Sequence, residues 1–230
     1  MSRKVFTAGE VLAAADVNSF LMDQTVMSFA GTAARGSAIP TPVEGMYTHL
    51  EDSDRLEFWN GSAWQSPDGL ALLASQSFTS ATEVIFNSVF SARYQNYILD
   101  FQTSTSSANQ DLVFTMRSGT TNATSTYFRT GVLTLHTDST VYGSNSSNSS
   151  SFFFNEVGSG FTSFARISFF QPFLSQLTQF NVQAFNRFGG DYRNRMGGGV
   201  HGEGNSYDGV RITCSSGNFT GTARLYGVKI

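Results

Sequence analysis

Chemically versatile side chains gather in one Gly-rich stretch, GGDYRNRMGGGVHGEGNSYDG, at residues 189–209. Its carboxylates could form the paired acids that glycoside hydrolysis needs, although the composition is more typical of a turn-rich surface loop. Arginine and tyrosine side chains in an exposed loop suit the recognition of anionic or sugar surfaces. We therefore predict a ligand-contact loop whose candidate residues are Asp191, Tyr192, Arg193, Arg195, His201 and Tyr207.

Other patterns that carry catalysis or metal binding do not occur in the sequence. The three histidines, His49, His136 and His201, lie 87 and 65 residues apart and form no cluster with metal-ligand spacing. There is no phosphate-binding loop, nucleophile elbow or zinc-protease motif. The acidic turn at residues 51–54 lacks the spacing and the glycine of a calcium loop, so it is interpreted as a solvated hairpin tip. The sequence thus predicts no catalytic residues, no metal and no cofactor, and a protein that is not an enzyme.

Composition indicates an all-β chain. Of 230 residues, 40% are hydrophobic, only 13% are charged and 14% are aromatic, with 22 Phe among them. Aromatic and β-branched residues fit pleated surfaces, and Gly and Asn fit tight turns. The single cysteine, Cys214, lies in the alternating stretch VRITCSS and is expected to be a buried thiol, so no disulfide within the chain is possible.

Charge and hydropathy exclude two partner classes. The net charge is −3, and no basic run exceeds two residues, so no nucleic-acid partner is expected. No apolar stretch approaches the roughly 20 residues of a membrane helix, and no signal peptide is visible, so we expect synthesis in a cytoplasm without membrane insertion. Residues 1–70 carry a net charge of −5 and residues 71–230 a net charge of +2, which suggests two parts with different surroundings.

Residues 71–230 contain a series of strand-like segments. Such segments, broken by Gly, Asn and Ser clusters, favour an antiparallel β-sandwich with a jelly-roll-like arrangement. Residues 139–160 are expected to form a loop or a flexible hairpin tip. The eight predicted strands are residues 83–90, 96–104, 111–119, 126–138, 161–173, 180–188, 209–216 and 221–230.

The N-terminal region predicts a short helix. Thr7 and Glu10 match a capping box, and Asp16 is a second good N-cap. The apolar residues then follow helical spacing up to Gly31, and such a short helix must pack on something else. We assign residues 1–35 as a helical anchor and expect its apolar stripe to lie at an interface through Val17, Phe20, Leu21 and Met27.

Residues 36–70 predict an extended arm followed by an aromatic β-hairpin. The expected strands are residues 45–50, 55–60 and 63–66, joined by the acidic turn and by Asn60-Gly61-Ser62. An isolated unit of this size is marginally stable and is too small to bury two tryptophans. We expect Tyr47, Leu56, Phe58 and Trp64 to lie on its buried side. The predicted docking residues are Tyr47, Phe58, Trp59 and Trp64.

Two long segments of the β domain carry no charge. They span residues 139–155 and 167–186 and intersperse Phe with Gln, Ser and Thr. Such surfaces suit a partly polar subunit interface, so we expect a homo-oligomer.

The N-terminal sequence resembles that of tailed-bacteriophage structural proteins. The resemblance covers about residues 5–65 and rests on the helix start FTAGE with ADVN, on EGM, on LED and on WNGSAW. It departs from the usual pattern at Ala13-Ala14, where Thr-Ala is common. A weaker similarity to the last strand of phage fibre domains covers SGNFTGTARLYGVKI at the C-terminus. The resemblance implies a virion component that is usually oligomeric and often trimeric, with an N-terminal attachment region and a C-terminal β head.

The leading functional hypothesis is therefore a non-enzymatic virion structural protein, similar to a tail fibre or tail tip. It would attach through its N-terminal region to other virion proteins and display the β domain to the host surface, with a cell-surface glycan as one conceivable ligand. The first alternative is a capsid decoration or head-fibre protein. The second is a polysaccharide-degrading fibre enzyme, which would need two suitably separated acids.

Overall fold

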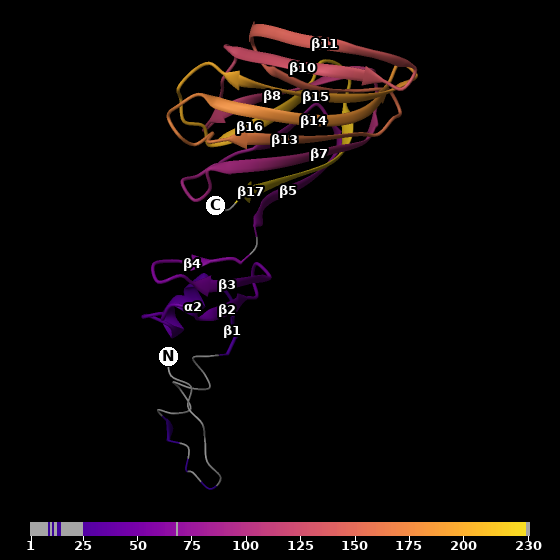
Figure 1. Cartoon of the computed structure of the whole chain (residues 1–230). Coiled ribbons are helices and arrows are strands. Elements are labelled where there is room, and N and C mark those ends of the chain that lie inside the picture. Colours follow the sequence, from indigo (N-terminus) through magenta and orange to yellow (C-terminus); the bar gives the residue numbers. More distant parts are fainter. Residues whose placement is uncertain (1–8, 10, 12, 15–24, 68, 229–230) are drawn as a thin grey trace. The chain divides into compact units, whose positions relative to one another are not determined.

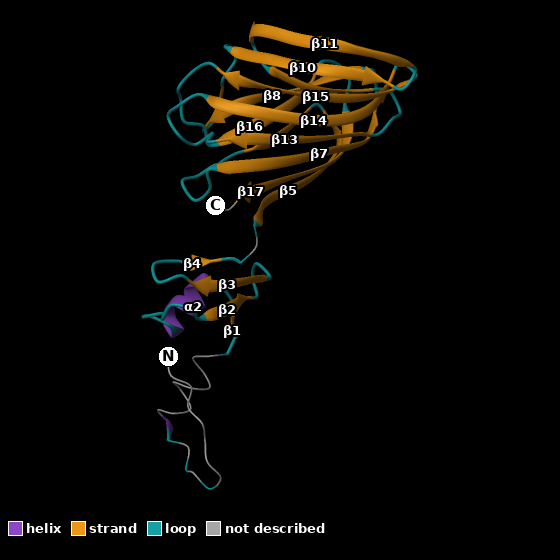
Figure 2. Cartoon of the chain, in the orientation of Figure 1, coloured by secondary structure: helices purple, strands orange, loops and turns teal. Residues whose placement is uncertain are grey.

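The computed structural model describes residues 9, 11, 13, 14, 25–67 and 69–228 (Figure 1). The chain is mainly β, with antiparallel sheets and a short helix among the described residues, which confirms the predicted fold class (Figure 2). It divides into two separately packed units, residues 1–68 and 69–230.

The larger unit consists of two antiparallel sheets. The eight-stranded sheet has the order β11 (Asp138–Ser149), β10 (Tyr127–Leu135), β15 (Asp191–His201), β14 (Thr178–Phe188), β13 (Ser163–Phe170), β7 (Asn96–Ser106), β17 (Phe219–Val228) and β5 (Leu70–Ala81). The second sheet has the order β12 (Phe152–Val157), β8 (Gln110–Ser118), β16 (Gly209–Cys214) and β6 (Glu83–Phe86), with β9 (Thr121–Asn122) paired to β8. Figure 1 views this unit from the side of the eight-stranded sheet.

Alternation along the strands places the core between the sheets. In β14, the side chains of Phe180, Val182 and Ala184 are buried while their neighbours are exposed. Phe114 of the second sheet packs edge-to-face on Phe180, with ring centroids 4.9 Å apart, and stacks on Phe152 at 5.0 Å. Aromatic pairs of this kind add stability beyond the area that they bury.

All eight strands predicted in the larger unit are present, but two segments predicted as loops are strands. Residues 139–160 contain most of β11 and the whole of β12, and residues 189–209 contain β15. β5 and β9 were not predicted either. β15 escapes sequence analysis because three successive glycines interrupt its side-chain alternation.

Those glycines allow neighbouring backbones to approach β15 closely. A Cβ atom built on Gly199 would lie 2.0 Å from the carbonyl oxygen of Phe128, and one on Gly198 would lie 2.8 Å from that of Phe180. The glycine run, which has the composition of a loop, is thus the part of β15 where the neighbouring strands β10 and β14 leave no room for a side chain.

The smaller unit contains the predicted hairpin and a helix. Its sheet has the order β1 (Met27–Phe29), β2 (Tyr47–Leu50), β3 (Arg55–Trp59) and β4 (Trp64–Gln65), and α2 spans Thr32–Ala38. The three expected hairpin strands are therefore confirmed, including the turn between Trp59 and Trp64, which pair directly.

Two predictions for this region are wrong. Met27 lies in β1, which pairs in parallel with β2, and not on a helix; the tertiary pairing outweighs the local helical spacing. The helix α2 instead begins in the last residues of the predicted anchor and extends into the segment predicted as an arm, and its Arg35 packs onto the hairpin. Val17, Phe20 and Leu21 lie outside the described residues.

Three of the four residues predicted to be buried in the hairpin, Tyr47, Leu56 and Phe58, lie on the face away from α2, whereas the fourth, Trp64, packs under Arg35 as expected. Thr48, Leu50 and Glu57 are buried, whereas Tyr47 is 41% exposed and Leu56 is 38% exposed. The register explains this result, because Tyr47 stands opposite Phe58 and His49 opposite Leu56 on the other face.

Candidate functional site

The predicted contact residues do not form one exposed loop. Tyr192 is exposed, but Arg195, His201 and Tyr207 are only 8%, 0% and 3% exposed. Nδ1 of His201 lies 3.1 Å from the hydroxyl of Tyr207, and burial lowers the pKa of His201. These three residues therefore serve the packing of the unit, and their prediction as surface contacts is wrong.

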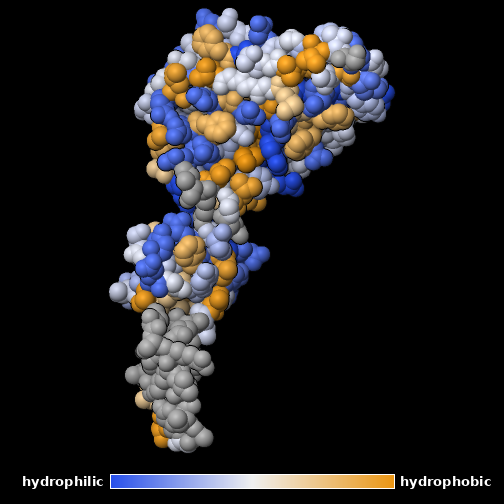
Figure 3. All heavy atoms as spheres, viewed as in Figure 1, coloured by the Kyte–Doolittle hydropathy of each residue, from blue (hydrophilic) through white to orange (hydrophobic). Residues whose placement is uncertain are grey.

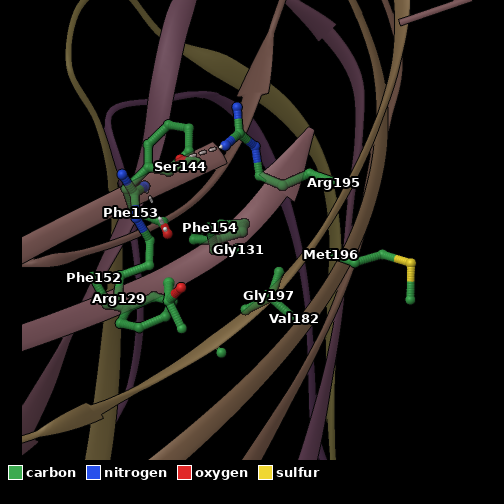
Figure 4. Close-up of a pocket in the computed structure, with 12 residues that line it drawn as sticks. Arg129, Gly131, Ser144, Phe152, Phe153, Phe154, Val182, Arg195, Met196 and Gly197 are labelled. Atoms are coloured by element: carbon green, nitrogen blue, oxygen red, sulfur yellow. Dashed lines mark hydrogen bonds between the residues drawn. The ribbon is translucent and has the colours of Figure 1, made fainter. Parts of the chain in front are cut away.

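Arg193 and Arg195 belong to a cluster of charges between the sheets. Their guanidinium groups lie 2.8 and 3.4 Å from the carboxylate of Glu156. The guanidinium carbons of Arg129 and Arg195 lie 4.5 and 4.6 Å from the centre of the Phe153 ring (Figure 4).

The contacts of this charged cluster indicate a role in packing. Arg195 donates a hydrogen bond to Ser144, and desolvation lowers the pKa of both Arg129 and Arg195. The cavity beside them measures only about 10 Å³, which is room for a single water molecule. We therefore conclude that these residues hold the two sheets of the larger unit together.

The outer face of the eight-stranded sheet carries a groove made of three adjoining hollows. Its central hollow, about 240 Å³, is walled by Phe161, Phe164, Phe185, Arg187 and Tyr192. A second hollow of about 480 Å³ continues from it across shared Gln102, and its further lining residues are Ser77, Phe78, Thr79, Ser104, Thr220, Gly221, Thr222 and Arg224. A third, of about 290 Å³, shares Phe164 and Phe185 and adds Gln183, Ala184, Asn194 and Met196. Together these three hollows are named the transverse groove.

The strand register shows how the transverse groove runs. Side chains on the outer face line up across six adjacent strands, β5, β17, β7, β13, β14 and β15. One such row consists of Ser77, Thr222, Gln102, Phe164, Phe185 and Asn194, each paired with the next. Since neighbouring strands lie roughly 4.8 Å apart, the five intervals make a groove about 24 Å long, at right angles to the strands.

Three ring faces are available in the central hollow of the transverse groove. Phe164, Phe185 and Tyr192 are 42%, 54% and 45% exposed. The rings of Phe185 and Tyr192 are nearly parallel, with centroids 6.2 Å apart and an interplanar angle of 11°. Figure 3 shows this side of the unit, where hydrophobic side chains form separate patches among hydrophilic ones.

The transverse groove carries positive charge on a chain that is negative overall. Its charged lining residues are Arg187 and Arg224, and none of the described residues lining it is Asp or Glu. The guanidinium carbon of Arg187 lies 4.2 Å from the centre of the Phe161 ring, and Nε of Arg187 is buried without a hydrogen-bond partner.

Neither arginine forms an ion pair with a carboxylate in the described part of the chain. Arg224 stands opposite Asp100 in the sheet, but both oxygens of Asp100 accept hydrogen bonds from Arg166, at 2.7 and 2.8 Å. The two guanidinium groups of the groove can therefore still take an anionic partner.

A second exposed surface lies on the smaller unit. Tyr47, His49, Leu56 and Phe58 share the sheet face that α2 does not cover, named the Tyr47 face, and the rings of Tyr47 and Phe58 lie 5.8 Å apart. Trp59 and Trp64 instead pack edge-to-face on each other, at 5.5 Å, and Arg35 covers Trp64. Of the predicted docking aromatics, Tyr47 and Phe58 thus point outward.

Sequence reasoning missed the transverse groove, although a signal for it exists. In FNVQAFNRF, the outward positions of the alternating strand are Asn181, Gln183, Phe185 and Arg187, so Phe185 interrupts an otherwise polar face. An aromatic residue on the polar face of a strand indicates a surface that binds something.

Within the described residues, no helix is long and apolar enough to cross a membrane, and no group of His, Cys, Asp and Glu side chains is arranged to hold a metal ion. Comparison of the chain with protein-family models, with curated proteins and with solved structures gives no match.

Proposed function

We propose that this chain is a non-enzymatic structural protein of a bacteriophage virion, of the tail-fibre or tail-tip kind. Its N-terminal region attaches it to other virion proteins, and its β-sandwich is displayed for binding to the host surface. The observation that carries this proposal is the presence of two separately packed units, each with its own uncovered binding surface: the Tyr47 face on one and the transverse groove on the other.

Further support comes from the lining of the transverse groove. A polysaccharide-degrading enzyme would hold two carboxyl groups beside its substrate, and the described lining residues offer hydroxyl, amide, aromatic and guanidinium groups instead. This composition favours binding over hydrolysis. The N-terminal resemblance to phage structural proteins accounts for the smaller unit as the attachment part, and self-association into a trimer is the expected assembly.

Localisation on intact particles tests the proposal. Antibody raised against the full chain and labelled with gold should decorate the tail or its tip in electron micrographs of purified virions. Label spread over the head would favour a capsid decoration or head-fibre protein. Particles without label would contradict the display of the β-sandwich at the surface.

A further inference from the structure

We infer that the transverse groove binds a linear saccharide chain that carries carboxylate groups. The inference deepens the host-surface binding proposed above, on which it rests, by naming the ligand class and its site. The rings of Phe164, Phe185 and Tyr192 supply stacking positions, and Arg187 and Arg224 supply contacts for carboxylates.

The shape of the groove favours an extended ligand. Three adjoining hollows cross six strands over about 24 Å. A compact metabolite would occupy one hollow and leave the others unused, whereas a linear polymer can follow the whole row from Ser77 to Asn194.

The lining chemistry matches the surface of a sugar. Hydroxyl and amide side chains both donate and accept hydrogen bonds, as sugar hydroxyl groups do, and here they come from Ser77, Ser104, Thr222, Gln102 and Asn194. The less polar C–H faces of a sugar ring pack well on exposed aromatic rings. Ring faces beside hydroxyl and amide groups are the combination that a saccharide chain needs.

Charge adds the requirement for an acid group. Arg187 and Arg224 lie in different hollows of the groove, and neither is paired with a described carboxylate. A guanidinium group binds a carboxylate through two parallel hydrogen bonds, which gives strength and direction. Two such groups on one groove fit a polymer in which the acid recurs along the chain.

An acidic peptide fits this site less well. Extended peptides usually bind by adding a strand to a sheet edge, where main-chain groups are free. The transverse groove instead crosses the face of the sheet, where the main-chain groups of β7, β13, β14 and β17 are engaged with neighbouring strands on both sides. Side chains alone make this surface.

The purified full-length chain can be tested on an array of linear oligosaccharides. Each acidic member, hexagalacturonate among them, is printed beside its carboxyl-reduced counterpart, and hexaglutamate is included as an acidic peptide. We expect retention of carboxylated saccharides only, weakened by salt. Retention of no member, equal retention of the reduced forms or equal retention of hexaglutamate would overturn the inference.

Matched variants then test the assigned residues on the best-bound oligosaccharide. Tyr192→Ala and Arg224→Gln should each raise the dissociation constant by about fivefold or more, because each removes one stacking or charged contact. Phe170→Ala, on the same sheet outside the groove, and Arg211→Gln, on the other sheet, should change it by less than about twofold. Controls that weaken binding as much as the groove variants would place the site elsewhere.

Two outcomes separate this inference from the proposed function. Gold label on the tail without saccharide binding would overturn the ligand assignment and leave the virion proposal standing. Saccharide binding together with an absence of gold label on the particles would overturn the virion proposal and leave the ligand assignment standing. If the groove variants instead change the mass of the oligomer measured by light scattering, the groove is a contact between copies of the chain, and the saccharide assignment is wrong.

Discussion

Arg35 shows how one side chain organises the smaller unit. It is 6% exposed, pairs with Glu57 through Nη1, and its guanidinium carbon lies 4.3 Å from the centre of the Trp64 ring. Arg35 thus connects α2 to β3 and β4 at once. A buried cation needs such partners, because desolvation without pairing is costly.

Replacing Arg35 with Met should destabilise the smaller unit by about 3 kcal/mol, because Glu57 would keep its burial but lose its most buried cationic partner. Urea unfolding followed by tryptophan fluorescence measures this effect, because both tryptophans, Trp59 and Trp64, lie in this unit. Arg55→Met is the matched control: Arg55 also pairs with Glu57, but its side chain is 32% exposed, so the loss should stay below about 1 kcal/mol. Equal losses of unfolding free energy in the two variants would show that the Arg35–Glu57 pair contributes no more to stability than a partly exposed ion pair.

Sequence analysis identified the reactive residue types in residues 189–209 but assigned most of them to the wrong surroundings. Tyr192 is exposed and lines the transverse groove, while Arg195 and His201 point into the unit. The difference arises from β15 itself, since alternate residues of a strand face opposite sides. A loop prediction hides that alternation and therefore treats all of these residues as surface contacts.

Among the secondary-structure elements, those with a regular pattern of apolar and polar side chains were predicted correctly. Strands such as β13 and β14 alternate apolar and polar residues and were predicted from the sequence. β11 is rich in Ser and Asn, and β15 is rich in Gly, so both have a composition typical of loops. Their strand state comes from pairing with β10, which lies between them and contributes hydrogen bonds that no local pattern reveals.

The close approach of β10 to β15 predicts a specific sensitivity to a single methyl group. Gly199→Ala should destabilise the larger unit by about 2 kcal/mol or more, because the new Cβ would lie 2.0 Å from the carbonyl oxygen of Phe128 and 2.5 Å from Cε2 of Phe152. Thermal unfolding followed by far-ultraviolet circular dichroism measures the change. Gly143→Ala on β11 is the matched control, because a Cβ there has nothing within 4 Å. If both variants unfold at the same temperature, β10 and β15 are not packed as closely as described.

For the whole molecule, the surfaces that the chain leaves uncovered are the ones available for contact with other chains. The larger sheet ends in β5, which carries no charged residue, and β11, whose one charged residue is Asp138. Exposed sheet edges are usually protected by charges or proline, since free main-chain groups pair with other chains. The Tyr47 face adds exposed aromatic surface on the smaller unit. All of these surfaces are consistent with the expected self-association, and they can be tested separately.

The Tyr47 face makes the clearest prediction about assembly. Tyr47→Ser together with Phe58→Ser should lower the mass of the full-length oligomer, measured by light scattering after size-exclusion chromatography, toward that of the 25.0-kDa chain. Aromatic side chains dominate the energy of interfaces in which they are buried, so losing two from one face should release the partner. Trp59 and Trp64 are unsuitable for this test, because they pack on each other and Trp64 also packs on Arg35. Their fluorescence instead reports that the double variant is still folded.

The control for that experiment is Phe128→Ser with Phe170→Ser, which removes two aromatic side chains, each 39% exposed, from the larger unit. If the Tyr47 face holds the copies together, this control should leave the mass unchanged while the Tyr47 and Phe58 variant dissociates. The opposite result would move the subunit contact to the part of the eight-stranded sheet that lies outside the transverse groove. An unchanged mass in both variants would assign self-association to the sheet edges, where β5 and β11 offer main-chain groups that side-chain substitutions leave intact.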